Sequence, residues 1–236
     1  MPSVLVAVLS DIHANRAALE AALAEADRRG AGALVCLGDV VGYGPDPEAC
    51  VDLVRERCET TVLGNHDAAV ARDEGLAVLP ADGQEAARRH REWLSDDQLA
   101  WLAGLPLVAE SHGATLAHAG PRDPASWPRL DSFPRVRAQF EAFDTPICFV
   151  GHSHRPAVVS DAMGVFTVRP GHRFVVDVGS VGQPRDRDPR LSFAMYDAEA
   201  GTVETVRVAY DVARTVARVR ERGLPARLGD RLQTGE

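Results

Sequence analysis

Short apolar runs alternate with amphipathic stretches at the start of the chain. Residues 4–9 form a continuous apolar run typical of a buried strand, and polar, loop-forming side chains follow it. Residues 16–29 have the Ala- and Leu-rich spacing of an amphipathic helix, with Asn15 as its N-cap and Gly30 at its end. A second apolar run follows at residues 33–37. This order predicts a strand–helix–strand unit.

The same alternation repeats once and then gives way to helices. We expect a helix at residues 48–57 and a third strand at residues 60–63. Residues 84–102 have the spacing of two helical segments, the second opened by Ser95, with no strand between them. We interpret these two segments as a helical layer.

Short apolar segments separated by Gly, Pro and Asp dominate the second half, and they predict an antiparallel or mixed sheet. The expected strands are residues 115–117, 147–150, 157–160, 165–169, 174–178, 191–196 and 203–208. A last helix is expected at residues 212–222. The predicted fold class is therefore α/β, with two sheets packed face to face and helices outside.

Length and composition indicate a single folded domain. The chain has 236 residues, of which 45% are hydrophobic and 25% are charged, as in ordinary globular proteins. Since chains of this size still pack around one core, we expect one domain over residues 1–236. The last ~15 residues are polar and contain Arg and Gly, and the sequence leaves open whether they are disordered.

The net charge of −8 argues against several partner classes. A protein of this sign repels phosphates at long range, so neither nucleic acid nor an anionic membrane is an expected partner. No apolar run approaches the ~18 residues of a membrane span. The N-terminus lacks the basic segment of a secretory signal, which predicts a cytoplasmic protein. A homo-oligomer is neither indicated nor excluded.

Side chains that bind metals follow one predicted strand after another. They are Asp11 and His13, then Asp39, then Asn65 with His66, then His118, and finally His152 and His154. Ligand sites in open α/β sheets lie at the carboxyl ends of strands, so we expect these side chains to meet. Asp39 suits a bridging position between two cations ~3.5–4 Å apart, because each carboxylate oxygen can contact one cation.

The donor types restrict the metal and indicate the substrate. Imidazole and oxygen donors suit Mn, Fe, Zn, Co or Ni, with Mn as the first candidate, and disfavour a calcium cage or a thiolate site. Two divalent cations would outweigh the charges of Asp11 and Asp39, so the site would favour a small anionic substrate such as a phosphate ester. A bridging water, its pKa lowered to ~7, would be the nucleophile.

The order of short motifs resembles the signature of the calcineurin-like metallophosphoesterases. The blocks are Asp11-Ile12-His13, Gly38-Asp39-Val40-Val41-Gly42, Gly64-Asn65-His66-Asp67, His118-Ala119-Gly120 and Gly151-His152-Ser153-His154. Each block alone is common, but this succession, with every block after a predicted strand, is specific. The resemblance runs from residue 4 to about residue 185. It is nearest to the small bacterial and archaeal single-domain phosphodiesterases, some of which hydrolyse diadenosine tetraphosphate.

The resemblance implies a four-layer sandwich of two mixed β-sheets flanked by helices, with a di-metal centre at one edge. It implies that one metal is held by Asp11, His13 and His154, the other by Asn65, His118 and His152, and that Asp39 bridges them. The implied activity is di-metal-dependent hydrolysis of a small phosphate ester, phosphodiester or nucleotide, by in-line attack of a metal-bridging hydroxide. Asn65 is expected to face the substrate as well as a metal.

The sequence leaves alternative roles open for three further residues near the expected ligands. His66 matches the family's non-ligand histidine, which implies a general acid or a contact to the phosphoryl oxygens. Asp67 either orients His66 or caps the following helix. Arg122 either binds a substrate phosphate bidentately or pairs with Asp123 or another acid.

Three further features receive no catalytic role. His90 is interpreted as a surface or satisfied core residue. Residues 185–188 are interpreted as a solvated loop of alternating charge. Tyr43 either packs its own loop or lines a base-binding pocket.

Two other functions stay open. A nuclease would need a basic groove or an added DNA-binding domain, and the chain is acidic. A non-catalytic metal-binding scaffold would be expected to lose ligands or the acid, and the motifs here keep both.

Overall fold

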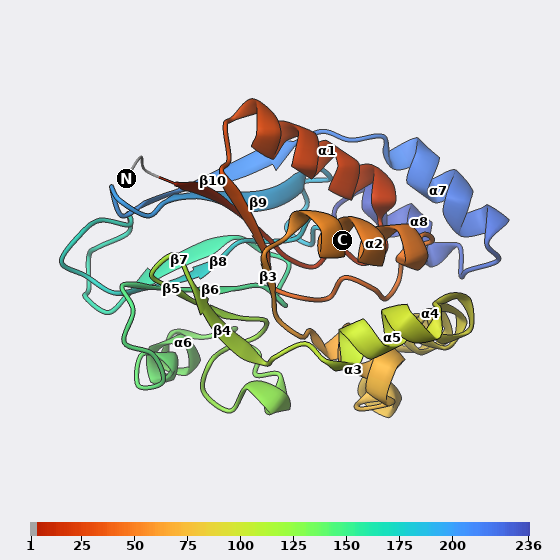
Figure 1. Cartoon of the computed structure of the whole chain (residues 1–236), viewed down its shortest axis with the longest axis horizontal. Coiled ribbons are helices and arrows are strands. Elements are labelled where there is room, and N and C mark those ends of the chain that lie inside the picture. Colours follow the sequence, from red (N-terminus) through yellow and green to blue (C-terminus); the bar gives the residue numbers. More distant parts are fainter. Residues whose placement is uncertain (1–3) are drawn as a thin grey trace.

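The computed structural model describes residues 4–236, which form two five-stranded mixed sheets packed face to face, with eight α-helices around them (Figure 1). The first sheet has the strand order β10 (Thr202–Val208), β9 (Leu191–Asp197), β1 (Leu5–Leu9), β2 (Ala33–Cys36) and β3 (Thr60–Thr61). The second has the order β4 (Val108–Ser111), β5 (Ala114–Ala117), β6 (Ile147–Val150), β8 (Phe174–Asp177) and β7 (Ala157–Ser160). The predicted α/β sandwich of two mixed sheets is confirmed.

Side chains alternate along the strands between neighbouring layers. In β1, Leu9 packs among the helices of the first sheet, whereas Val8 lies in the core between the sheets. In β6, Phe149 lies in that same core, and Cys148 packs on the far side with Phe140, next to α6 (Phe133–Gln139). Since successive strand residues point to opposite faces, this alternation produces the order helix, sheet, sheet, helix.

The first helices form the parallel crossovers that the sequence predicts. α1 (Arg16–Arg28) connects β1 to β2, and α2 (Pro47–Arg57) connects β2 to β3. Asn15 caps α1 as predicted, because its side chain accepts a hydrogen bond from the main-chain N–H of Ala18. α7 (Val212–Glu221) lies beside α1 on the outer side of the first sheet (Figure 1).

The predicted helical layer is also present. It consists of α4 (Ala81–Trp93) and α5 (Asp96–Ala103), with Ser95 as the N-cap of α5. α3 (Asn65–Arg72), which the sequence analysis did not predict, packs against both (Figure 1). The third strand is shorter than expected, since its ladder with β2 ends at Thr61.

Two differences lie in the second half of the chain. Residues 165–169 are not a strand: they belong to the loop between β7 and β8, and Phe166 there is 81% exposed. β4 was not predicted, because its Val-Ala-Glu-Ser sequence lacks a clear apolar alternation.

The C-terminal tail folds. It contains α8 (Arg227–Asp230) and the 3-10 helix η3 (Arg231–Gln233), and it buries Leu228 and Leu232. The sequence left open whether this tail is disordered, and in the structure it packs against the rest of the protein. Residues 1–3, part of the N-terminal stretch used to argue against a secretory signal, lie outside the described residues.

Within residues 4–236, no helix combines the length and the apolar character needed to cross a bilayer. The cytoplasmic location stays a prediction.

Candidate metal centre

The predicted ligands meet where the two sheets present the carboxyl ends of their parallel strands. Asp11 and His13 follow β1, Asp39 follows β2, Asn65 opens α3, His118 follows β5, and His152 and His154 follow β6. These segments are far apart in the sequence, and the parallel pairings β1–β2 and β5–β6 place their ends together. The fold therefore brings together every residue predicted as a ligand.

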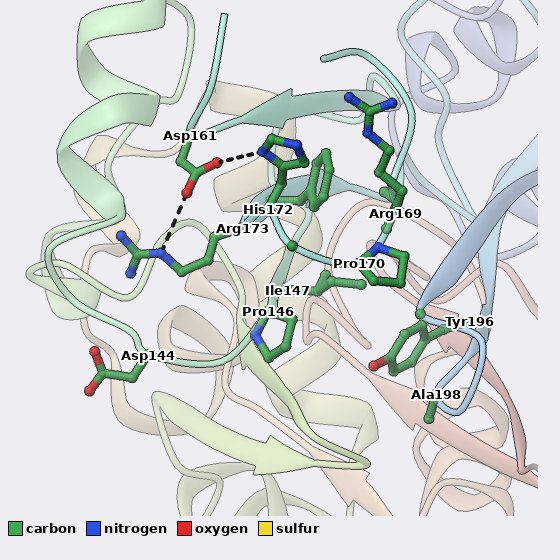
Figure 2. A pocket seen from close by; sticks show the side chains of 14 residues that line it. Asp144, Pro146, Ile147, Asp161, Arg169, Pro170, His172, Arg173, Tyr196 and Ala198 are labelled. Carbon is green, nitrogen blue, oxygen red and sulfur yellow. Dashed lines mark ion pairs between the residues drawn. The ribbon is translucent and has the colours of Figure 1, made fainter.

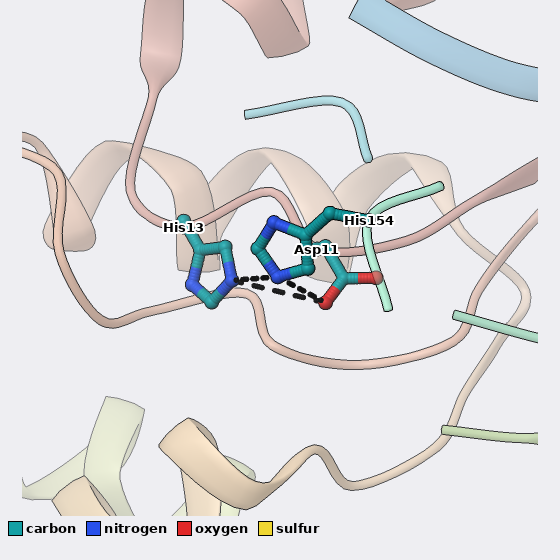
Figure 3. A group of neighbouring side chains, drawn as sticks. All are labelled: Asp11, His13 and His154. Atoms are coloured by element: carbon teal, nitrogen blue, oxygen red, sulfur yellow. Dashed lines mark hydrogen bonds and ion pairs between the residues drawn. The ribbon is translucent and has the colours of Figure 1, made fainter. Parts of the chain in front are cut away.

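One group consists of Asp11, His13 and His154 (Figure 3). The His154 Nε2 atom lies 3.1 Å from Asp11 Oδ1 and 3.1 Å from His13 Nε2. His13 Nε2 lies 3.7 Å from the same Asp11 oxygen. All three side chains are buried. Three donor atoms thus face one point inside the protein.

Asp39 connects this group to a second one. Its Oδ2 atom lies 3.7 Å from His13 Nε2 and 3.3 Å from His118 Nε2. Asn65 Oδ1 lies 3.2 Å from His118 Nε2, and His152 has a ligand atom within 4.8 Å of those of Asp39 and His118. Asp39 therefore occupies the position expected of a bridging carboxylate.

The imidazole rings are oriented by main-chain carbonyl groups. Nδ1 of His13 bonds to the carbonyl of Val41 at 3.1 Å, and Nδ1 of His118 bonds to the carbonyl of Leu37 at 2.9 Å. Nδ1 of His154 bonds in the same way to a main-chain carbonyl. Because a carbonyl can only accept, each Nδ1 is the donor, and the lone pair of each neutral ring lies on Nε2, toward the centre.

Two buried carboxylate oxygens point at these nitrogens. Asp11 Oδ1 and Asp39 Oδ2 have no hydrogen-bond partner in the part of the chain that the structure describes. Leaving such atoms without a hydrogen bond in the interior is costly. Divalent cations would remove this cost, and imidazole with carboxylate oxygen is a donor set that Mn, Fe, Zn, Co or Ni accepts. The residues present therefore fit a pair of divalent metal ions.

The pKa values show how strongly the site attracts positive charge. Burial raises the pKa of Asp39, but His118 and His66 more than offset this and hold it well below its usual range. Burial lowers the pKa of His118, and the Asp39 carboxylate opposes this and raises it to about 10. Without metal, a proton on His118 balances Asp39, and a cation would take the place of that proton.

The main chain at the site is held in a costly conformation. Positive φ angles occur at Asp11 (51°), His13 (48°), Asp39 (52°), His152 (65°) and His154 (60°). Each non-glycine residue in this region costs of order ~1–3 kcal/mol, and such strain concentrates at functional sites. The surrounding fold thus stabilises ligand positions that the local sequence disfavours.

His66 lies at the edge of the two groups. Its main-chain N–H donates to Asp39 Oδ1 at 2.8 Å, and its buried Nδ1 has no partner within residues 4–236. Burial lowers the pKa of His66 to about 4. One of its ring nitrogens lies within 4.8 Å of ligand atoms of His13 and Asp39, so the ring is close enough to contact a substrate bound at the centre.

Asp67 has the contacts of a helix cap. Its carboxylate accepts from the N–H of Gly64 at 3.1 Å and from the N–H of Val41 at 3.0 Å. Among the described contacts, no hydrogen bond joins it to His66. Of the two roles that the sequence left open for Asp67, the geometry favours capping.

Arg122 forms an ion pair at the protein surface. Its side chain is 54% exposed and pairs with Glu141 at 3.2 Å, rather than with Asp123. Of the two roles that the sequence left open for Arg122, the structure shows the ion pair with an acid. Phosphate binding by Arg122 stays a prediction.

Tyr43, for which the sequence left two roles open, and Arg185, which received no role, lie on the His66 side of the site. The ring of Tyr43 is buried, 4.4 Å from the His66 ring and 4.8 Å from the His13 ring between centroids. The guanidinium of Arg185 lies over Tyr43, 5.6 Å from the ring centroid. Residues 185–188 do form a loop of alternating charge, and within it Arg185 is half-buried. In the sequence, Arg185 lies next to a Gly-rich block that follows a strand, and this position could have identified Arg185 as a residue near the site.

His90 is a satisfied core residue, one of the two alternatives for it. Its Nδ1 accepts from the N–H of Gly42 at 3.0 Å, and its Nε2 donates to the carbonyl of Gly44 at 2.8 Å. These two bonds hold the loop that carries Tyr43 against the site.

A separate cavity of about 370 Å³ lies at the opposite ends of β6 and β8, next to Ile147 and Phe174 (Figure 2). Asp161 lines it and pairs with His172 and Arg173 at 3.8 Å each. Since the ligands follow the other end of β6, this cavity does not belong to the metal centre.

Known proteins share both the sequence and the fold. The model of the calcineurin-like phosphoesterase superfamily domain matches residues 4–201. The uncharacterized protein MJ0912 of Methanocaldococcus jannaschii is 36% identical over 242 residues, which cover 98% of each chain. A metallophosphoesterase structure from Sphaerobacter thermophilus has a TM-score of 0.87 and 36% identity, and covers 99% of this chain and 100% of that one. Hypothetical protein PH1004 from Pyrococcus horikoshii OT3 shares the fold, with a TM-score of 0.81, 24% identity and 99% of both chains covered.

Proposed function

The chain belongs to the calcineurin-like phosphoesterase superfamily, and from that membership we propose that it hydrolyses a small phosphate ester, phosphodiester or nucleotide with two divalent metal ions. The observation that carries the proposal is the pair of buried oxygens Asp11 Oδ1 and Asp39 Oδ2, which face imidazole nitrogens and lack hydrogen-bond partners among residues 4–236. Buried carboxylate oxygens without hydrogen bonds are expected where cations bind, because without a cation their burial costs free energy of folding.

The proposed roles follow the two groups of ligands. Asp11, His13 and His154 would hold one metal, Asn65, His118 and His152 would hold the other, and Asp39 would contact both. Bound divalent cations would supply a nucleophilic hydroxide near neutral pH and offset the charge of the phosphoryl group. Manganese is the first ion to test, since the donor set accepts several metals.

His66 is the proposed general acid. The hydrogen bond from its N–H to Asp39 Oδ1 fixes the start of α3 beside the ligands. With its pKa lowered to about 4 by burial, the free ring is neutral near pH 7. A bound phosphate would favour the charged imidazolium, because an opposite charge at short range stabilises it. The ring nitrogen that faces His13 and Asp39 would then pass its proton to the leaving oxygen.

Hydrolysis assays with purified protein and Mn²⁺ test the proposal. The substrates are p-nitrophenyl phosphate, bis-p-nitrophenyl phosphate and diadenosine tetraphosphate. Asp39→Asn should abolish both turnover and Mn²⁺ binding, whereas His66→Gln should abolish turnover and retain Mn²⁺. His172→Gln, far from the site, is the matched control. Tight Mn²⁺ binding with every ester intact would instead indicate a metal-binding scaffold and would end the hydrolase proposal.

A further inference from the structure

The loop that joins β6 to β7 carries two of the candidate ligands, one in each group. His154 lies with Asp11 in the first group, and His152 lies with His118 in the second. A single residue, Ser153, separates the two histidines in the sequence. The conformation of this short loop therefore places candidate ligands of both groups at once.

This loop has a costly main-chain conformation, with positive φ angles of 65° at His152 and 60° at His154. Since residues other than glycine disfavour this region, contacts with other segments must hold the loop in place. Two such contacts involve the histidines themselves. The N–H of His152 donates to Asp11 Oδ2 at 2.9 Å, and Nδ1 of His154 donates to the carbonyl of Gln183.

A third contact comes from a residue outside the ligand set, Asp177 at the end of β8. Ser153 Oγ donates to Asp177 Oδ2 at 2.6 Å and accepts from the main-chain N–H of Arg155 at 3.0 Å. Asp177 Oδ1 accepts from the main-chain N–H of Gly179 at 2.9 Å. Both oxygens of this buried carboxyl group are thus used, one on the ligand loop and one on the loop that follows β8.

Strand pairing places Asp177 beside both ends of the ligand loop. β8 pairs in parallel with β6 and antiparallel with β7, the two strands that the loop connects. In these ladders Asp177 lies opposite Val150, the last residue of β6, and opposite Ala157, the first residue of β7. A hydrogen bond from this position to Ser153 therefore restrains the middle of the loop relative to its two ends.

We propose that Asp177 is a positioning residue of the metal centre, which holds His152 and His154 in their metal-binding conformation through its hydrogen bond to Ser153. This inference rests on the proposed function, because it concerns the ligands of the same centre. Within residues 4–236, no hydrogen bond joins Asp177 to either histidine, so its effect passes through the Ser153 hydroxyl group. Groups that orient metal ligands typically change metal affinity ~10–100-fold when they are replaced.

The test measures Mn²⁺ affinity by calorimetry in the wild type, in Ser153→Ala, in Asp177→Ala and in the double variant. Each single variant should bind Mn²⁺ at least ~10-fold more weakly than the wild type. The double variant should bind no more weakly than the weaker single variant, because both changes break the same hydrogen bond. Asp177→Asn should stay closer to the wild type than to Asp177→Ala, since its amide can accept from Gly179 and donate to Ser153 Oγ.

Ser160→Ala and Asp161→Ala are the matched controls, because they make the same changes at the far end of β7. Both should bind Mn²⁺ as the wild type does. The free energy of unfolding in urea with EDTA reports the structural cost of each change without metal. If Ser153→Ala and Asp177→Ala lose stability in EDTA but keep the wild-type Mn²⁺ affinity, the hydrogen bond supports only the fold and the inference is refuted. Additive losses of Mn²⁺ affinity in the double variant would also refute it.

Turnover separates this inference from the proposed function. If bis-p-nitrophenyl phosphate is hydrolysed and Ser153→Ala keeps the wild-type Mn²⁺ affinity, the positioning role fails and the hydrolase stands. If no ester is hydrolysed, but Mn²⁺ affinity falls in Ser153→Ala and is retained in Asp177→Asn, the positioning role stands and the hydrolase fails. Should Asp177→Ala not fold, these two variants carry the comparison, because Ser153 is only half-buried and Asn has the shape of Asp.

Discussion

Replacing Gly64 by Ala should displace Asp39 without removing any ligand. A Cβ atom at position 64 would lie 2.1 Å from Asp39 Oδ1 and 2.2 Å from the Asp39 main-chain nitrogen. Ordinary contacts are ~3.5 Å or longer, so the groups must move apart by more than ~1 Å. A shift of that size in a catalytic site costs ~10²-fold in rate, and the crowding itself costs ~1–3 kcal/mol of stability.

The assay is a Mn²⁺ titration by calorimetry, followed by kcat/KM with bis-p-nitrophenyl phosphate. We expect Gly64→Ala to be folded by circular dichroism and to lose about two orders of magnitude in both quantities. Gly32→Ala is the control, because its Cβ would meet only Val4 Cγ1, at an ordinary 3.5 Å. A folded Gly64→Ala protein with the Mn²⁺ affinity of the wild type would refute the assignment of Asp39 as a ligand.

Three further predictions concern stability. Chelation with EDTA should lower the Tm measured by calorimetry, because Asp11 Oδ1 and Asp39 Oδ2 would lose the cations that offset their charge. Mn²⁺ at ~100 times its Kd should restore about 2.7 kcal/mol, and no change on chelation would contradict metal binding. Asp67→Asn should lower the free energy of unfolding in urea by ~1–3 kcal/mol, since an amide cannot accept from both Gly64 and Val41; an unchanged value would exclude the capping role. Burial lowers the pKa of His90 to about 3, below its unfolded value of ~6.5, so the unfolded state binds the proton and stability falls as the pH is lowered. Between pH ~7.5 and ~5.5 the wild type should lose ~1.4 kcal/mol more than His90→Asn in urea unfolding, and equal losses would contradict the buried neutral imidazole.

The first strands, the main helices and the meeting of side chains at the candidate metal centre could be predicted from the sequence. An apolar run followed by Asp or His indicates both a buried strand and the side chain at the carboxyl end of that strand. Residues 4–9 therefore predicted β1 followed by Asp11, and residues 33–37 predicted β2 followed by Asp39. β6 was predicted with the bounds it has. Local patterns were sufficient here because the strands are buried on both faces.

What could not be predicted depends on contacts between distant segments. Residues 165–169 have the composition of a strand, but no neighbouring strand pairs with them in the structure. The polar tail folds because Leu228 and Leu232 dock on the body of the protein, and a local pattern of so few apolar residues gives no sign of that. Arg185 has a neighbour of opposite charge in the sequence, Asp186, which pairs with Arg207 instead.

The most direct test of the account is anomalous scattering from crystals grown with Mn²⁺, recorded at the manganese absorption edge. We expect two peaks ~3.5–4 Å apart, one beside Asp11, His13 and His154 and the other beside Asn65, His118 and His152, with Asp39 contacting both. Asp39→Asn crystals should lack both peaks, since this variant is expected to lose Mn²⁺. Wild-type crystals with no anomalous peak among these side chains would contradict the central claim.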